Sequence, residues 1–210
     1  FGCGTGELDL VLARWGASIL GFDFNTDSIE RATSLAAEAS TVENINVKFF
    51  VGDIDTFTIA PSSYDIALSM GVLAHVPDQH AMFMRMASAI NSGGYLILGF
   101  IEDSGLIQRL LHRAIVRAIA PQDDAAIHGT AQRLFGEHIE RSVRHGNCSA
   151  ESVINDYLVN PHYVGVPFQV IDSWAQDLGL NYYSSWPSTD LPFPVDSPDE
   201  PVVARTSDPY

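Results

Sequence analysis

Short apolar runs alternate with amphipathic segments through residues 1–100. Runs typical of β-strands occupy residues 18–23, 47–53, 64–70 and 95–100. The helical spacing i, i+3, i+4, i+7 is followed by Leu8, Val11, Leu12 and Trp15, and again by Phe83, Met86, Ala87 and Ile90. Strands that alternate with helices predict an α/β fold: a doubly wound, mostly parallel sheet with helices on both faces.

Signals at the ends of these segments support the same order of elements. Gly16 is a C-terminal stop for the first helix. Asp27 and Glu30 form a capping-box-like start for a second helix, which we expect to extend to about Ala39.

The pattern changes after Phe100. Residues 106–119 have a strongly apolar helical pattern that ends before Pro121, and one side of the helix holds Ile107, Leu110, Leu111, Ala114 and Ala118. Further helices are predicted over about 124–145, 150–158 and 168–178, followed by a strand-like segment at 181–186. The predicted division is a core at 1–103, a helical insertion or substrate lid at 104–165, the final helix and strand of the core at 166–186, and a Pro/Asp-rich tail at 187–210.

The chain begins directly at a glycine-rich turn, with Phe1 alone in front of it. In a doubly wound sheet a strand leads into this turn, and that strand lies in the middle of the sheet, buried on both faces. We therefore expect the sequence to be a fragment of a longer protein, and a targeting segment before Phe1 is not excluded.

Composition and charge narrow the choice of partners. The 210 residues are 46% hydrophobic and carry a net charge of −15, with Lys48 as the only lysine. Such a charge repels phosphate backbones and anionic lipid, so we expect neither nucleic acid nor membrane as a partner, although Arg109, Arg113 and Arg117 fall at helical spacing. No stretch reaches the roughly 18–20 apolar residues of a membrane span.

Cysteine and histidine spacing gives no sign of a metal site. Cys3 and Cys148 are too few for a disulfide framework or a four-ligand zinc site. The low cysteine count is consistent with a reducing compartment, and we expect a cytoplasmic protein.

The opening turn has the spacing Gly2-x-Gly4-x-Gly6, and Glu7 stands where the dinucleotide fingerprint requires its third glycine. Glycine allows close approach of the backbone to a ligand and a positive φ. The first helical turn is acidic, with Glu7 and Asp9, so it favours a cationic ligand over a phosphate. S-adenosylmethionine (SAM), which carries a sulfonium and an ammonium and no phosphate, has these properties.

Two acids at strand ends strengthen the prediction of a nucleoside ligand. If the strand expected before Phe1 is counted as the first, Asp23 closes the second strand, where a carboxylate can accept both ribose hydroxyls. Asp53 closes the third, where it can accept from the adenine amine while the Ile54 N–H meets a ring nitrogen. The alternatives are that Asp23 caps the next helix and that Asp53 is a solvated strand-end acid.

Four segments in order, "FGCGTGELDLVLARWGASILGFDFN", "VGDIDTF", "YDIALSMGVLAHVPD" and "INSGGYLILGF", resemble the successive motifs of class I SAM-dependent methyltransferases. The resemblance covers residues 1–100 and implies a Rossmann-like methyltransferase fold, with the helical insertion after the fifth strand, and SAM as cofactor. The cofactor-binding residues that it implies are Gly2, Cys3, Gly4, Gly6, Asp23, Phe24, Asp53, Ile54, Ser69 and Met70. The segment that begins "DYLVNPHYVGVPF" resembles the C-terminal part of small-molecule methyltransferases.

The acceptor side of the expected reaction has fewer candidates. His75 follows the fourth predicted strand and is the candidate general base, or alternatively a loop-fixing residue. Tyr157, His162 and Tyr163 are candidates for the acceptor pocket, with packing as the alternative for all three. We therefore predict a methyltransferase for a small-molecule acceptor. The alternatives are an NAD-dependent oxidoreductase and a catalytically inactive protein that retains the cofactor fold.

Overall fold

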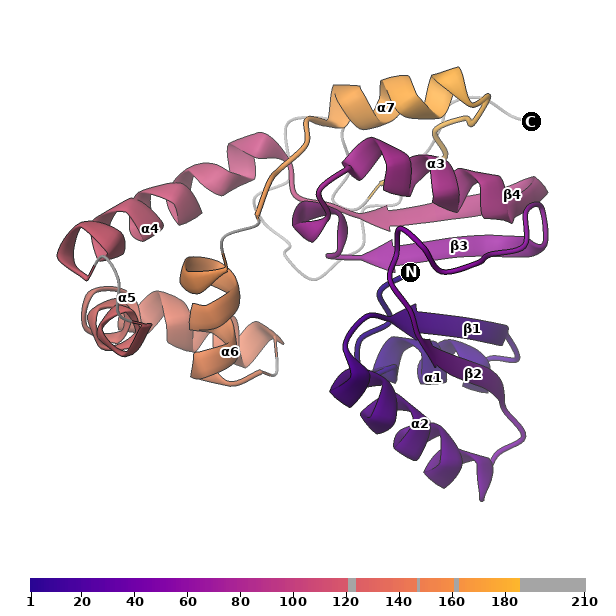
Figure 1. Ribbon diagram of the computed structural model, residues 1–210, viewed down its shortest axis with the longest axis horizontal. Coiled ribbons are helices and arrows are strands. Elements are labelled where there is room, and N and C mark those ends of the chain that lie inside the picture. Colours follow the sequence, from indigo (N-terminus) through magenta and orange to yellow (C-terminus); the bar gives the residue numbers. More distant parts are fainter. Residues whose placement is uncertain (121–123, 147, 161–162, 186–210) are drawn as a thin grey trace, which may run out of the picture. The chain divides into compact units, whose positions relative to one another are not determined.

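The computed structural model describes residues 1–120, 124–146, 148–160 and 163–185 (Figure 1). The chain divides into two compact units, Phe1–Phe168 and Gln169–Tyr210. The predicted tail at 187–210 lies outside the described residues. No helix among the described residues is long and apolar enough to cross a membrane.

All described strands pair in parallel, as predicted. Strand β1 (Ser18–Asp23) pairs with β2 (Asn46–Val51), and β3 (Tyr64–Met70) pairs with β4 (Ile90–Gly99). The described strands thus form two separate pairs. Residues 1–3 hydrogen-bond to both: the Cys3 N–H donates to the Phe22 carbonyl of β1, and the Phe1 nitrogen donates to the Leu68 carbonyl of β3.

Four helical elements flank these strands: α1 (Glu7–Arg14), α2 (Thr26–Ser40), the short 3₁₀ helix η1 (Leu73–His75) and α3 (Gln79–Ala89). The N-cap of α2 is Asn25, whose side chain accepts from the Ser28 N–H. The predicted cap Asp27 instead lies in the first turn, where a carboxylate favours the positive end of the helix dipole.

Helix α1 forms where the spacing predicts it, but its apolar stripe is not its buried side. Leu10 and Ala13 are the buried residues, whereas 47% of Leu8, 39% of Val11 and 80% of Trp15 are exposed. Helical spacing identifies an apolar stripe, but the elements in contact with the helix decide which side is covered. Here α1 contacts β1 and β2 through the side that carries Leu10 and Ala13.

Aromatic and aliphatic side chains fill the space around the strands. Phe22 of β1 is buried and stacks on Phe57 with 4.4 Å between ring centroids. Helix α3 buries Met82, Phe83, Met86 and Ala89. The predicted face of α3 therefore shares Phe83 and Met86 with the face that is observed.

The segment predicted to be a helical insertion, called the insertion below, contains η2 (Asp103–Leu106), α4 (Ile107–Ile119), α5 (Asp124–Gly146), α6 (Ala150–Ile154) and η3 (Asn155–Val159). Helix α5 has a non-helical residue, Phe135, at a kink. The element η3 is a π-helical turn, in which the Asn160 N–H donates to the Asn155 carbonyl at 2.8 Å. These helices share their own apolar core, formed by Val116, Ala120, Ile127, Ala131, Ile139, Ile154 and Leu158.

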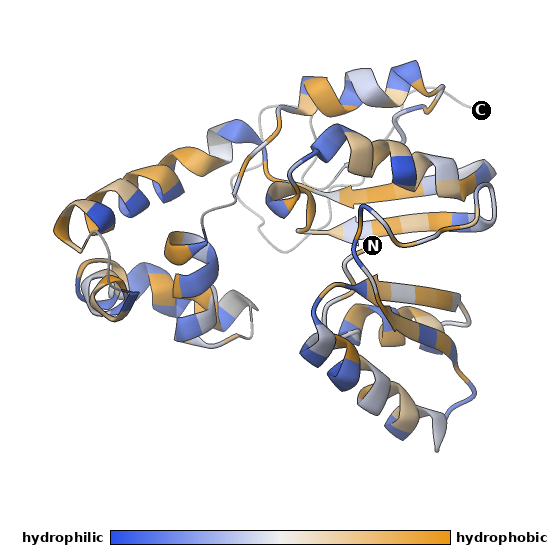
Figure 2. Ribbon diagram, in the orientation of Figure 1, coloured by the Kyte–Doolittle hydropathy of each residue, from blue (hydrophilic) through white to orange (hydrophobic). Residues whose placement is uncertain are grey.

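Helix α4 also forms where it is predicted, and again its apolar side is not the buried one. Ile107, Leu110 and Leu111 are more than half exposed, and Val116 and Arg109 are the buried residues of this helix. Figure 2 shows the strong hydrophobic colouring of α4 beside its polar positions. The apolar core of the insertion packs against the side of α4 that carries Val116, so the more apolar side of this helix remains exposed.

The second unit contains α7 (Phe168–Asp177) except for its first residue. Gly179 has φ +71°, and its N–H donates to the Gln176 carbonyl, so glycine ends the helix as predicted. Residues 181–185 form no strand, in contrast to the strand-like segment that the sequence predicts.

Candidate functional site

The N-terminal turn adopts the conformation that its glycines allow. Gly2, Gly4 and Gly6 have φ of +65°, +53° and +75°, and Gly6 is the N-cap of α1. A Cβ on Gly6 would lie 2.7 Å from Phe49 Cζ, whereas one on Gly4 would have nothing within 4 Å. Gly6 is thus required by packing, while Gly4 leaves the backbone open for a ligand.

Asp23 connects this turn to the carboxyl end of β1. Its Oδ2 accepts from the Gly4 N–H at 2.9 Å, and its Oδ1 accepts from the Asn25 N–H at 2.9 Å. Asn25, not Asp23, caps α2, so the helix-cap alternative for Asp23 is wrong. Each carboxylate oxygen can accept more than one hydrogen bond, so Asp23 can still bind a ligand hydroxyl.

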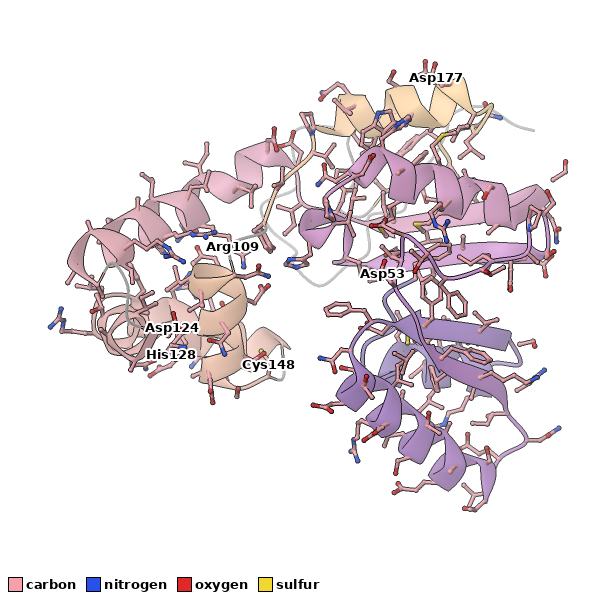
Figure 3. The ribbon with its side chains drawn as sticks, in the orientation of Figure 1. Asp53, Arg109, Asp124, His128, Cys148 and Asp177 are labelled. Atoms are coloured by element: carbon pink, nitrogen blue, oxygen red, sulfur yellow. The ribbon has the colours of Figure 1, made fainter. Side chains whose placement is uncertain are left out.

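The other residues expected around the cofactor lie at neighbouring strand ends. Asp53, which is labelled in Figure 3, follows β2, is exposed, and accepts from the Asp55 N–H at 2.7 Å. Ile54 comes next and is partly buried. Phe24 follows Asp23 and is 78% exposed. A carboxylate, an adjacent backbone N–H and an exposed aromatic ring are groups that bind a nucleoside.

Ser69 and Met70, at the end of β3, have different surroundings. Ser69 is buried, and its hydroxyl donates to the Phe1 carbonyl at 3.1 Å. Met70 is 54% exposed. The Ser69 side chain therefore stabilises the first residues of the chain, and Met70 is the residue of the pair with accessible side-chain atoms.

The charged side chains near the turn are acidic. Burial raises the pKa of the Asp9 carboxyl above its usual value. Burial, with the nearby carboxylates Asp9 and Asp23, raises the pKa of the Cys3 thiol to about 12. Cys3 is therefore a neutral thiol within the turn, and the charges there suit a cationic ligand.

His75, at the end of η1, is brought into contact with the insertion. Asn160 Nδ2 lies 3.1 Å from His75 Nδ1, and Asp156 Oδ1 lies 3.7 Å from His75 Nε2. The Tyr163 ring packs edge-on against His75 with 5.0 Å between centroids. Residues far apart in the sequence thus meet at the expected catalytic position.

Arg109 of α4 holds this group together (Figure 3). It is 5% exposed, and its Nη2 donates to Asp156 Oδ2 at 2.7 Å. Its guanidinium carbon lies 4.7 Å from the Tyr157 ring centroid and 3.1 Å from that of Tyr163. Burial lowers the pKa of Arg109 from its usual value, although Asp156 opposes this shift.

Of the predicted acceptor-side residues, the structure brings His75, Tyr157 and Tyr163 to one cluster, and His162 lies outside the described residues. Sequence reasoning missed Arg109, Asp156 and Asn160. An arginine within a strongly apolar helix was the one available signal, because an isolated buried charge requires a partner. Among the described residues there is no group of three side chains that could hold a metal ion.

Comparison with known proteins finds similarity to methyltransferases. A family profile described as a methyltransferase domain matches residues 1–142. The ubiquinone biosynthesis O-methyltransferase of Coxiella burnetii (strain Dugway 5J108-111) is 33% identical over 101 residues, which cover 48% of this chain and 42% of that protein. The match thus spans less than half the length of that curated relative.

Solved structures extend the comparison to the fold. A SAM-dependent methyltransferase from Methanosarcina mazei is 25% identical, with a TM-score of 0.46, over 54% of this chain and 56% of that chain. PKMT2 from Rickettsia typhi is 17% identical, with a TM-score of 0.64, over 86% of this chain and 37% of that chain. The second match shows a shared fold.

Proposed function

Because the chain belongs to the class I SAM-dependent methyltransferases, we propose that it transfers a methyl group to a hydroxyl of a small-molecule acceptor. Family membership removes the NAD-dependent oxidoreductase as an alternative. The single observation that carries the proposal is the left-handed glycine turn that is hydrogen-bonded to the strand-end carboxylate of Asp23.

The residues of this turn and of the neighbouring strand ends fit SAM. Gly2, Cys3, Gly4 and Gly6 would hold its methionine part through backbone groups, and Gly4 has open space where a Cβ would stand. Asp23 and Phe24 would bind the ribose, and Asp53 with Ile54 the adenine. Ser69 and Met70 would lie beneath the sulfonium, with Met70 making the side-chain contact. When bound, SAM supplies a methyl group that is already activated by the positive sulfur.

Support for oxygen as the acceptor atom comes from relatives that are named O-methyltransferases. A hydroxyl carries a proton that must leave, so the site needs polar groups near the acceptor. His75 would contact the acceptor, with Tyr157 and Tyr163 from the insertion beside it, and His162 remains a candidate of the same kind. Orientation by the site then supplies the larger part of the rate, about 7–11 kcal/mol for a well-aligned reaction.

Isothermal titration with S-adenosylhomocysteine tests the cofactor part of the proposal, and NAD serves as the matched negative ligand. We expect saturable binding of S-adenosylhomocysteine and none of NAD. No binding of S-adenosylhomocysteine at millimolar concentration would contradict the proposal. Binding without methyl transfer to any hydroxyl compound would favour the inactive alternative.

A further inference from the structure

An open cavity of about 440 Å³ lies beside α4 and the middle of α5. Gln108 and His112 line it from α4, and residues 132–138 with Arg141 line it from α5. Helix α5 is kinked here, because Phe135 has non-helical backbone angles (φ −129°, ψ 23°), and its ring stacks on His112 with 3.8 Å between centroids. Pockets for small molecules have volumes of about 300–1,000 Å³, so this cavity has room for one.

Most polar side chains of the cavity have no partner in the part of the chain that the structure describes. His112 is the exception, since its Nδ1 lies 3.4 Å from the Tyr157 hydroxyl. The lining side chains that make no hydrogen bond or ion pair with any described residue are Gln108, Gln132, Arg133, Glu137, His138 and Arg141. Their hydrogen-bonding groups are therefore available to a ligand.

The charges of the lining favour an anion. Arg133 and Arg141 are positive and Glu137 is negative, so the lining has a formal charge of +1 while its two imidazoles are neutral. Burial and the neighbouring His138 lower the pKa of His112 below its usual value. This positive lining contrasts with the net charge of −15 of the whole chain. A guanidinium donates two parallel hydrogen bonds to a carboxylate or a phosphate, and side-chain amides add further donors.

The cavity is distinct from the candidate cofactor and acceptor residues. None of the residues that line it belongs to the glycine turn, to the strand ends or to the acceptor candidates. It adjoins the acceptor candidates through Tyr157, whose ring centroid lies 5.1 Å from that of His138. A molecule bound here would therefore be held beside Tyr157 without occupying the place of SAM.

We propose that this cavity is a second small-molecule site, in which Arg133 and Arg141 bind an oxyanion group, a carboxylate or a phosphate. Glu137 opposes this binding by charge repulsion and sets an upper limit to the affinity. Binding at this cavity goes beyond the proposed function, because it requires neither SAM nor methyl transfer.

Nuclear magnetic resonance of the full-length protein tests the site, with inorganic phosphate and succinate as the two probes. Each is titrated at pH 7, with sodium chloride keeping the ionic strength constant. The imidazole signals of His112 and His138 report on the cavity, and His128, which hydrogen-bonds to Asn155 outside the lining, is the reference. We expect saturable shifts of the two cavity signals and none of His128. Tighter binding of phosphate would identify a phosphate as the preferred group, and tighter binding of succinate a carboxylate.

Charge substitutions in the lining should act with opposite signs. Arg133→Gln and Arg141→Gln should each weaken phosphate binding about tenfold, because charge-assisted hydrogen bonds are lost. Glu137→Gln should strengthen it about threefold, because the repulsion is removed. Arg144→Gln, on the same helix, exposed and outside the lining, is the matched control. It should change the affinity by less than about twofold, because exposed charges at a distance are screened.

Equal weakening by Arg144→Gln would show a response to overall charge only and would overturn the proposal. A response that does not saturate by about 50 mM of either probe would also overturn it. Both lining arginines are exposed, so we expect their variants to melt at the wild-type temperature. If either variant does not fold, Glu137→Gln decides, and no gain in affinity would overturn the proposal. Failure to bind S-adenosylhomocysteine would contradict the proposed function and leave this site unaffected.

Discussion

At the scale of single residues, Asp23 joins the glycine turn to the end of β1 through the Gly4 N–H. We expect Asp23→Ala to weaken the affinity for S-adenosylhomocysteine by roughly 10- to 100-fold, because two charge-assisted hydrogen bonds to the ribose are lost. Asp23→Asn, which keeps one acceptor oxygen, should lose less. Titration calorimetry measures both affinities. An unchanged affinity in Asp23→Ala would mean that Asp23 stabilises the glycine turn and does not bind the ribose.

Gly4 and Gly6 differ in their surroundings although both have positive φ. Gly4→Ala should lower the free energy of unfolding by about 1 kcal/mol, the cost of the left-handed conformation alone. Gly6→Ala should cost about 1–3 kcal/mol more, because its Cβ would lie 2.7 Å from Phe49 and 2.9 Å from Ala32. Urea denaturation compares the two. Equal costs would mean that Phe49 moves aside freely.

Cys3 and Cys148 should differ sharply towards thiol reagents. The thiolate is the reactive species, and the pKa of Cys3 is raised to about 12, so Cys3 stays protonated at any pH well below that value. Cys148 is exposed. We expect iodoacetamide near pH 8 to modify Cys148 and to spare Cys3, as peptide mass spectrometry would show. In Cys148→Ser the folded protein should take up little label, and rapid labelling there would contradict the raised pKa of Cys3.

At the scale of elements, α4 presents its apolar side outward. Leu111 is 58% exposed and Val116 is 0% exposed. Leu111→Gln should therefore change the free energy of unfolding by less than about 0.5 kcal/mol, whereas Val116→Ala should lower it by about 2 kcal/mol through cavity formation. Thermal and urea unfolding measure both. A large loss in Leu111→Gln would show that the exposed side of α4 is covered in solution.

Sequence patterns predicted where elements lie better than which side they bury. The bounds of β1 and β3 match the predicted segments, because a strand is a local run of apolar residues ended by polar ones. The buried sides of α1 and α4 depend on neighbouring elements, which local spacing does not specify. The same holds for the candidate site. Asp23 could be predicted as a site residue because it lies at the end of a strand. Asp156 could not, because only the packing of the insertion brings it near His75.

At the scale of the whole molecule, the expected cofactor contacts all precede Phe100, and Asp156 comes from the insertion. Deletion of residues 104–158, bridged by a short linker, should leave the affinity for S-adenosylhomocysteine within about tenfold, because exposed connections tolerate change. Methyl transfer should be abolished, because the acceptor loses its orienting groups. A folded deletion variant that no longer binds S-adenosylhomocysteine would show that the insertion also builds the cofactor site.

The π-helical turn η3 has a consequence for how this site could arise. A π-helical turn holds one residue more than an α-helical turn, and each residue of an α-helix rotates the chain by about 100°. Removing one residue from η3 would restore regular winding and rotate the residues at the end of this turn, Leu158 and Val159, away from their present directions. A single codon gained or lost in this short stretch could thus switch the acceptor side of the enzyme between two lineages while the cofactor side stayed unaltered.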